Sequence, residues 1–502
     1  MRAFNSRISR ITIKTIAISL FVIFALPAFA HDEPNGMHLS TKSPQAHAYF
    51  EKGLQKMEML HIQDGLDNFR KSVQADPQFA LGHIILMFFT QDPTEQVAER
   101  EKALHTRSSA NLEEQYIVDW LANANQARWI PAIQAMNEAL QRYPRDKHLA
   151  WLAGWWLVVN QNQSARALPL FERVIQIDPK FADAWNEAAY CYARLGNFEK
   201  SFAHIQHYTE LVPDEANPQD SFAEISRMAG RFDEALKHYR MSLKIDPSFH
   251  ESQLGLGDTY ALMGDESRAR TEYAIAIGEG SEVQKVTWGL QSAATYVREG
   301  DLSGADKAFR SVAKQAHNDD FANLEAEAFR SMAMYQKDPA AAMDLLKKAE
   351  KVLQEEHKVP QALLTEELSE VLRTRIERAL AVGNMDLASV SLKQLDDLAA
   401  GSADDLVQAA YHGASGTVLL SQGKMDEAIS HLEEDENNPI SMRGLVQAYQ
   451  KAGQKESADR LAARLAGFNI PVIEQALVVP EFRKQRTLAS ADSAPAPSSR
   501  NK

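Results

Sequence analysis

The chain has 502 residues, of which 45% are apolar and 24% charged, and it carries a formal net charge of −14. This acidic balance disfavours nucleic acid as a partner, because phosphate backbones are bound by basic surfaces, and it favours basic partners. With Cys191 as its only cysteine, the chain cannot form an internal disulfide or a cysteine-rich zinc site. Its length exceeds what a single hydrophobic core usually supports, so an architecture that grows lengthwise is favoured.

The first 30 residues have the features of a secretory signal peptide. Four basic side chains lie between residues 2 and 14, an apolar stretch follows over residues 15–29, and Ala28 and Ala30 mark a small-x-small cleavage site. The stretch is shorter than the roughly 20 residues that a membrane-spanning helix needs, although an uncleaved anchor is the alternative. We predict cleavage after Ala30, export by the general secretory route, and a periplasmic or secreted protein.

A polar lead over residues 31–44 precedes a long region in which glycines and prolines recur every 34 residues. The residues that keep this step are Gly196, Gly230 and Gly264 and, in their own phase, Pro179, Pro213 and Pro247. A period of 34 predicts stacked helix–turn–helix units that bury their apolar faces jointly. The glycines suit the left-handed end of a first helix, and each proline ends a second helix because it lacks an N–H donor.

Small and aromatic residues recur in step with the glycines. Ala189, Ala223 and Gly257 occupy the point where the two helices of a unit are expected to cross, and bulk there would push the backbones apart. This pattern resembles the tetratricopeptide repeat (TPR) family. The residues that carry the resemblance are Trp185, Tyr192 and Pro213 in one unit and Leu256, Gly257, Tyr260, Ala269 and Ala276 in another. The resemblance implies an all-α fold, an α-solenoid of stacked TPR-like units with a right-handed superhelical twist. Residues 214–221 are similar to the joint between repeats in bacterial members, so an exported bacterial TPR protein is expected.

The repeat pattern divides into an N-terminal array over residues 45–280 and a more divergent C-terminal array over residues 281–482. One continuous array is equally compatible with the sequence, because weaker units continue past the division. Residues 483–502 end in a stretch rich in Ala, Ser and Pro that is typical of a disordered tail.

The resemblance also implies a binding groove, because the first helix of each unit lines the concave face of such arrays. The candidate partner-binding residues are Leu152, Trp156, Asn186, Tyr190, Asp220, Glu224 and Asp258. In this order the groove changes from apolar and aromatic to acidic, so the expected protein or peptide partner carries an apolar anchor and a basic segment. For Trp156, packing against a neighbouring helix is the alternative.

The sequence contains no pattern that marks an enzyme or a cofactor site. It has no phosphate-binding loop, dinucleotide fingerprint or Gly-x-Ser-x-Gly elbow, and we expect no catalytic residue, cofactor or bound metal. His204 and His207 share a helix face but match no metalloenzyme spacing, so a solvated face is expected. After cleavage His31 would be the N-terminal residue, and copper binding through its amine and ring is a remote alternative.

These features predict a non-catalytic scaffold that binds a peptide or protein partner in its concave groove outside the cytoplasm, without stable membrane insertion after cleavage. The alternative is a subunit of an envelope assembly or export complex that binds folded partners with its convex face. An enzyme is a remote alternative.

Overall fold

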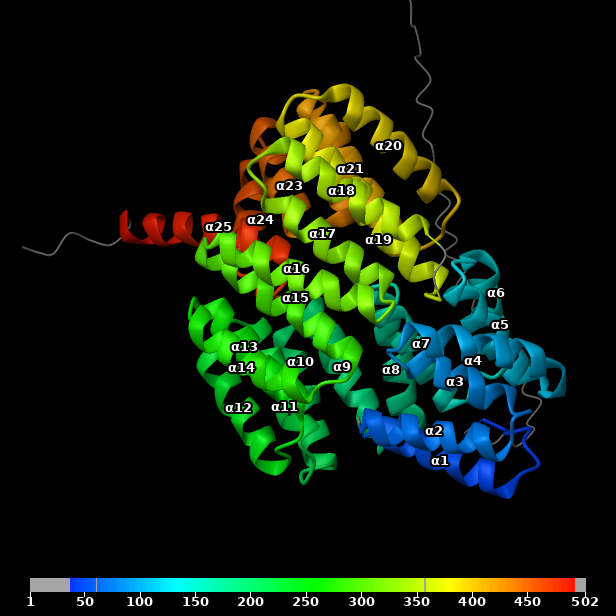
Figure 1. Cartoon of the computed structure of the whole chain (residues 1–502). Helices are drawn as coiled ribbons and strands as arrows, with labels where there is room; N and C mark the ends of the chain where they lie inside the picture. Colours follow the sequence, from blue (N-terminus) through cyan, green and yellow to red (C-terminus); the bar gives the residue numbers. More distant parts are fainter. Residues whose placement is uncertain (1–36, 60, 356–357, 493–502) are drawn as a thin grey trace, which may run out of the picture.

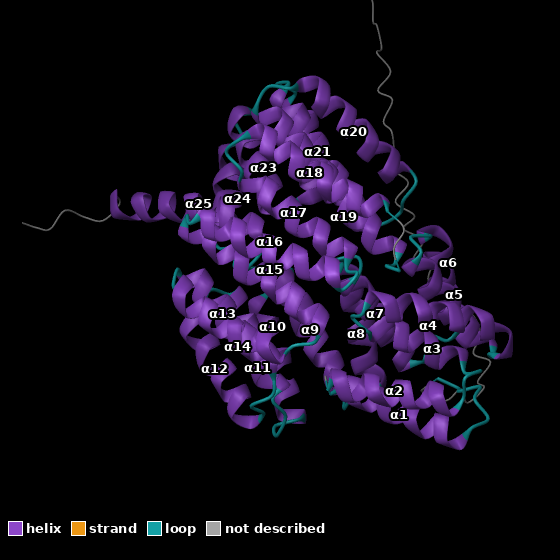
Figure 2. Ribbon diagram, viewed as in Figure 1, coloured by secondary structure: helices purple, strands orange, loops and turns teal. Residues whose placement is uncertain are grey.

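All regular secondary structure in the described part of the chain is helical (Figures 1 and 2). The computed structural model describes residues 37–59, 61–355 and 358–492. The predicted signal peptide and residues 31–36 of the polar lead, His31 included, therefore lie outside the described residues. The helices follow one another as the first and second members of helix–turn–helix pairs, which confirms the predicted all-α solenoid of repeat units.

The first helices of the pairs are α1 (Pro44–Glu58), α3 (Ala80–Phe89), α5 (Leu112–Asn125), α7 (Lys147–Val159), α9 (Ala182–Arg194), α11 (Asn217–Met228), α13 (His250–Met263), α15 (Glu282–Glu299), α17 (Ala322–Tyr335), α19 (Gln361–Ala381), α21 (Asp405–Ser421) and α23 (Pro439–Lys451). The second helices are α2 (Ile62–Ala75), α4 (Pro93–Thr106), α6 (Trp129–Arg142), α8 (Ser164–Ile177), α10 (Phe198–Leu211), α12 (Phe232–Ile245), α14 (Glu266–Glu279), α16 (Leu302–Asn318), α18 (Pro339–Gln354), α20 (Met385–Ala400), α22 (Met425–Leu432) and α24 (Lys455–Ala466). The helix α25 (Ile473–Asp492) follows the last pair, and the short 3-10 helices are η1 (Arg107–Ser109) and η2 (Glu433–Asp435).

The two helices of a pair cross at a small residue, as the repeat pattern predicts. A Cβ atom on Gly257 of α13 would lie 2.7 Å from the Tyr273 ring of α14. The same arrangement sets Gly154 of α7 against Phe171 of α8, where a Cβ atom would lie 2.6 Å from the ring. An aromatic ring of the second helix fills the space that the absent side chain leaves, so a larger residue would push the two helices apart.

In most pairs, the turn between the two helices contains a residue in the left-handed region. Gly196, Gly230 and Gly264 have φ values of +78°, +75° and +83°, which confirms the predicted left-handed glycines. Ala127 stands in the turn between α5 and α6 with a φ of +57°. Left-handed backbone costs a residue with a Cβ atom about 1–2 kcal/mol, so this turn is strained relative to the glycine turns.

The pairs stack into a curved array. The first helices of neighbouring pairs contact each other, as α9 contacts α11 and α11 contacts α13, whereas the second helices α10 and α12 make at most weak contact. The first helices therefore lie on the inner side of the curve. We call the side of α7, α9, α11 and α13 that carries Trp156, Tyr190, Glu224 and Asp258 the inner face. Stacking continues through the predicted division at residue 280, because α14 contacts α15.

The array curves until distant repeats meet (Figure 1). The helix α19 contacts α5, and Ala362 of α19 belongs to the same hydrophobic core as residues of α1 to α9. The helix α25 contacts α15 as well as α23 and α24, so it joins the middle repeats to the last ones. The superhelix is thereby closed on itself at two separate contacts.

The last helix extends farther than the sequence analysis predicted. Residues 483–492 belong to α25, whereas the expected tail began at residue 483. Arg483 provides a physical reason, because its guanidinium donates hydrogen bonds to the backbone oxygens of Leu262 and Ala466 and to Asn469 Oδ1. These bonds hold the helix against other repeats past the predicted boundary. Residues 493–502 lie outside the described part.

Candidate functional site on the inner face of the repeats

The apolar end of the predicted groove lies inside the hydrophobic core. Leu152 and Trp156 of α7 are only 1% and 2% exposed. The Trp156 ring packs edge-on against Trp120 of α5, with ring centroids 5.7 Å apart, and against Trp129 of α6, at 6.0 Å. In this conformation neither side chain offers a surface to a partner, so packing against neighbouring helices describes Trp156 correctly.

Trp156 also lines a small cavity of about 80 Å³ between the first repeats and α19. The walls include the rings of Phe88 and Trp129, and Glu366 contributes a carboxyl group from α19. The cavity therefore lies where the closed superhelix brings distant repeats together, rather than on the open inner face.

A buried aspartate organises the tryptophans next to this core. Asp183 of α9 is fully buried and accepts hydrogen bonds from Trp151 Nε1 at 2.6 Å and from Trp155 Nε1 at 3.0 Å. Asn186, a predicted site residue, donates to the same carboxylate at 3.3 Å and is itself buried. Burial raises the pKa of Asp183 to about 6, and the hydrogen bonds oppose that shift. Asp183 and Asn186 thus tie α7 to α9.

The acidic end of the predicted groove is a hydrogen-bonded chain of side chains that crosses three repeats. Glu224 of α11 accepts a hydrogen bond from Tyr190 of α9 at 2.9 Å and from Arg227 at 2.8 Å. Arg227 also donates to Asp258 of α13 at 3.0 Å, and Asp258 accepts from Tyr273 at 2.6 Å. The structure therefore brings Tyr190, Glu224 and Asp258 together, as the groove pattern predicts. Arg227, which the candidate set omitted, neutralises part of the predicted acidic surface.

The members of this chain differ in their exposure to solvent. Arg227 and Asp258 are 4% and 5% exposed, whereas the Glu224 side chain retains 37% of its surface. Asp220 is buried, accepts a hydrogen bond from Ser252 at 2.6 Å, and has its pKa raised to about 8, chiefly by burial. Tyr190 is half-buried. Of the seven predicted residues, Tyr190 and Glu224 are therefore the two that offer surface to a partner.

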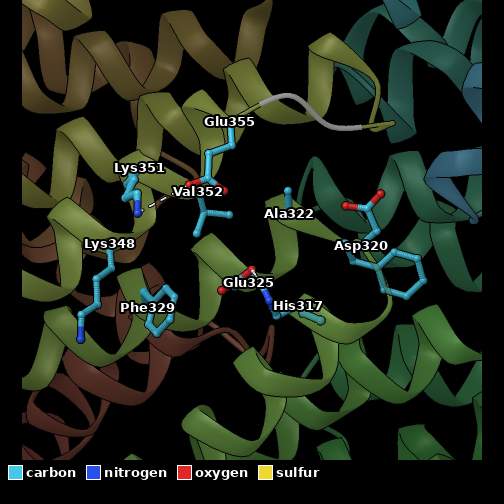
Figure 3. Close-up of a pocket in the computed structure, with 11 residues that line it drawn as sticks. His317, Asp320, Ala322, Glu325, Phe329, Lys348, Lys351, Val352 and Glu355 are labelled. Atoms are coloured by element: carbon cyan, nitrogen blue, oxygen red, sulfur yellow. Dashed lines mark hydrogen bonds and ion pairs between the residues drawn. The ribbon is translucent and has the colours of Figure 1, made fainter.

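A separate recess of about 300 Å³ lies among α16, α17 and α18 (Figure 3). Its apolar side includes Phe321 and Phe329. At its rim, His317 Nδ1 lies 3.1 Å from a Glu325 oxygen, and Lys351 Nζ pairs with Glu355 at 3.7 Å. The recess therefore combines an apolar side with a polar rim.

The described residues contain no group of three or more His, Cys, Asp and Glu side chains arranged to hold a metal ion. His204 and His207 pack on the Trp185 ring, at centroid distances of 5.2 and 4.1 Å. Within residues 37–59, 61–355 and 358–492, no helix has the length and apolar character needed to span a bilayer.

Comparison with known proteins identifies the part of the chain that matches a repeat family. A family model described as a tetratricopeptide repeat matches residues 159–220, from the end of α7 into α11. Residues 159–220 are therefore tetratricopeptide repeats. The matched TPR units include α9 and its turn at Gly196, which are the elements that hold Asp183, Asn186 and Tyr190 on the inner face.

The TPR relatives are distant. The chain is 32% identical over 126 residues to the anaphase-promoting complex subunit CDC16 of Saccharomyces cerevisiae, covering 25% of this chain and 15% of that protein. It is 26% identical over 251 residues to the cellulose synthase 1 operon protein C of Komagataeibacter xylinus, covering 44% of this chain and 18% of that protein. The chain thus spans less than a fifth of the length of either relative. The crystal structure of yeast Tom70 matches with a TM-score of 0.41 at 14% identity, covering 85% of this chain and 99% of that one.

Proposed function

We propose that this protein is a non-catalytic scaffold that binds a protein or peptide partner on the inner face of its TPR array. The observation that carries the proposal is the strip of Tyr190 and Glu224, which offers surface beside the buried Arg227–Asp258 pair. TPR proteins generally act by binding proteins or peptides, and the fold and the relatives of this chain support the same role. The buried pair fixes the position of Glu224, so a partner meets a preorganised carboxylate.

The proposed partner carries a basic segment and an aromatic or apolar residue. A basic side chain would pair with Glu224, and the Tyr190 ring would supply the apolar contact. This assignment replaces Leu152 and Trp156 as the anchor, because both are buried in the core. Asp220 and Asp258 would act indirectly, since their oxygens are already held by Ser252, Arg227 and Tyr273.

A matched pair of glutamates tests the inner-face site. Glu224 forms an i,i+3 pair with Arg227 on α11, and Glu234 forms one with Arg231 on α12, a second helix. Their side chains are 37% and 38% exposed, respectively. Partners captured from extracts should bind Glu224→Ala more weakly by roughly 1 kcal/mol or less, with a flatter salt dependence. Tyr190→Ala should weaken binding by about 2 kcal/mol. Binding lost in Glu234→Ala but kept in both inner-face variants would contradict the proposal.

Export is part of the proposal. It rests on the basic, apolar and small-x-small order of residues 2–30. The chain is also similar to the cellulose synthase 1 operon protein C, and a subunit of an envelope assembly or export complex is the alternative to a free scaffold. Amino-terminal sequencing of the protein from cell fractions tests this point. A mature start at His31 supports export, and a retained Met1 contradicts it.

A second candidate function uses the outer surface. Ile130 of α6 is 73% exposed, and with Ile133 and Gln134 it borders an open recess of about 370 Å³. An exposed isoleucine beside an open recess suits a folded partner, as in an assembly subunit. Ile130→Glu should then abolish assembly while Glu224→Ala has no effect, which is the reverse of the result expected for the inner face.

A further inference from the structure

Two histidines meet across the α21–α22 hairpin. His412 of α21 and His431 of α22 have their Nδ1 atoms 3.0 Å apart, with ring centroids separated by 4.9 Å. Both side chains are half-buried, so solvent and small ions reach them. The short turn at Gly423, with a φ of +79°, fixes the hairpin that sets the two rings opposite each other. The pair is therefore held by the fold rather than by a flexible surface segment.

The contact between the two imidazole rings favours their uncharged forms. Of two hydrogen-bonded ring nitrogens 3.0 Å apart, only one carries a proton, which it donates to the lone pair of the other, so at least one imidazole is neutral. Burial lowers the pKa of His412, and the neighbouring His431 lowers it further. Burial also lowers the pKa of His431. The neutral imidazole is the form that binds metal ions.

Two glutamate carboxylates near the histidine pair form no ion pair with other described residues. Glu434 acts electrostatically on both histidines, and Glu427 acts on His431 from one helical turn earlier in α22. Both glutamates are exposed, and neither forms an ion pair with another described residue. As placed, neither carboxylate joins the two nitrogens as a third ligand, so rotation of an exposed side chain or a water molecule would complete a coordination shell.

We propose that His412 and His431 form a binding site for a divalent transition-metal ion, with Glu434 as the third ligand. Metal–imidazole bonds of about 2.0–2.1 Å place two nitrogens bound at right angles about 3 Å apart, which matches the observed separation. Small rotations of the rings would turn both lone pairs toward one ion. Nitrogen ligands select ions such as zinc, cobalt, nickel and copper over magnesium and calcium.

Cobalt(II) is a suitable probe, because its visible absorption reports nitrogen and oxygen ligands directly. The titration uses the full chain with His31→Ala, so that an N-terminal histidine does not contribute. We expect a single saturable equivalent that zinc displaces. His412→Gln and His431→Gln should each weaken binding by about tenfold or more, and Glu434→Gln by a smaller factor.

Substitution of both His204 and His207 by Gln is the matched control, because it removes another close pair of helical histidines. It should leave cobalt binding unchanged. Glu434 is exposed, so its variant separates loss of a ligand from loss of fold, and thermal unfolding without metal checks the histidine variants. The proposal is overturned by the absence of saturable binding, or by binding that persists unchanged in both His412→Gln and His431→Gln. Unchanged affinity in Glu434→Gln would overturn the third ligand.

Discussion

The two contacts that close the superhelix are built from different chemistry. The carboxyl contact joins Glu366, Asp404 and Asp405 of the later repeats to Gln161 and Arg166 of the earlier ones. The C-terminal contact joins Arg483 and Asn469 to backbone carbonyl groups of the middle repeats. Carboxyl groups titrate and carbonyl groups do not, so one closure should respond to pH and the other should not.

The carboxyl contact concentrates acids in a small volume. Asp404 is fully buried, caps α21 by accepting from the Leu406 N–H at 3.0 Å, and has its pKa raised to about 6, chiefly by burial. Burial and the neighbouring Asp404 raise the pKa of Glu366 well above its ordinary value. Among the described residues, a single cation pairs with this group of acids, since Arg166 lies 3.5 Å from an Asp405 oxygen. The contact therefore depends on protons retained by Glu366 and Asp404.

The C-terminal contact depends on a permanent charge. Arg483 donates to the Leu262 carbonyl oxygen at 3.0 Å and to Asn469 Oδ1 at 2.6 Å. Asn469 in turn donates to the Met228 carbonyl oxygen at 3.3 Å. An arginine stays charged at every pH at which the protein folds. These hydrogen bonds hold α25 on α13, and the segment before α25 on α11, without titrating.

Replacement of Gly257 disturbs the packing of α13, the helix that carries the Leu262 carbonyl of the C-terminal contact. A Leu side chain at this position of α13 would collide with the Tyr273 ring, 2.7 Å from the position of its Cβ atom. We expect Gly257→Leu to lower the free energy of unfolding by about 3 kcal/mol or more, and to loosen α25 because Leu262 lies on the same helix. Thermal and denaturant unfolding measure the loss. A midpoint unchanged within about one degree would show that the helix crossing is misplaced.

Arg483→Ala breaks the C-terminal contact alone. It removes charged donors from three carbonyl oxygens and Asn469, and should cost about 2–3 kcal/mol. Arg464→Ala on α24 is the control, because its pair with Glu436 is on the surface. Hydrogen exchange should quicken in α25 and not in α19. Equal losses for the two arginines would argue against a special role for Arg483.

Glu366→Gln tests the carboxyl contact through pH. Because the folded pKa values of Glu366 and Asp404 are raised, the stability of this contact is complete at low pH and is lost as pH rises through about 6 and above. Wild-type protein should lose about 1–2 kcal/mol more than the Glu366→Gln variant between pH 5 and pH 8. Glu138→Gln on the partly exposed side of α6 should retain the wild-type slope. If the free energy of unfolding changes with pH by the same slope in all three proteins, the carboxyl contact does not contribute to the pH dependence.

Replacement of Ala127 by glycine tests the backbone strain in a turn of the early repeats. Ala127 has a φ of +57°, where glycine fits without a steric penalty. The substitution should raise the free energy of unfolding by about 0.5–1 kcal/mol, after the entropic cost of glycine is deducted. The expected gain should be the same at pH 5 and pH 8, because no titrating group is changed. Destabilisation in urea unfolding would contradict the account of strain at this turn.

The repeat architecture was predictable because its signals are local. Gly257 and Tyr273 belong to one helix pair, and the left-handed backbone at Gly264 needs only its own residue. The extent of α25 was not predictable, because the partners of Arg483 include a carbonyl 221 positions away in the chain. Closure of the superhelix is a sum of small rotations between pairs, and no single motif in the sequence encodes that sum.

The inner face was predicted only in part, because the sequence indicates its local contacts and not those between distant residues. The spacing within α9 and α11 correctly brings Tyr190 to Glu224. The burial of Trp156 was left open, because Trp120 and Trp129 reach it from another pair whose turn at Ala127 lacks the glycine signal. The three tryptophans in residues 151–156 were the available hint, since buried indole N–H groups need acceptors such as Asp183.

Pulsed electron spin resonance on two labelled pairs tests the central claim, that the superhelix is closed by one pH-dependent and one pH-independent contact. One pair spans the carboxyl contact at Asn137 and Val390, and the other spans the C-terminal contact at Met263 and Lys484, all of them exposed positions. Cys191 is buried, and burial raises its pKa to about 12, so it should not take up label. From about pH 5 to pH 8 the first distance distribution should broaden and lengthen while the second stays narrow. Two distributions that respond alike to pH, or that are both broad at pH 5, would contradict the account.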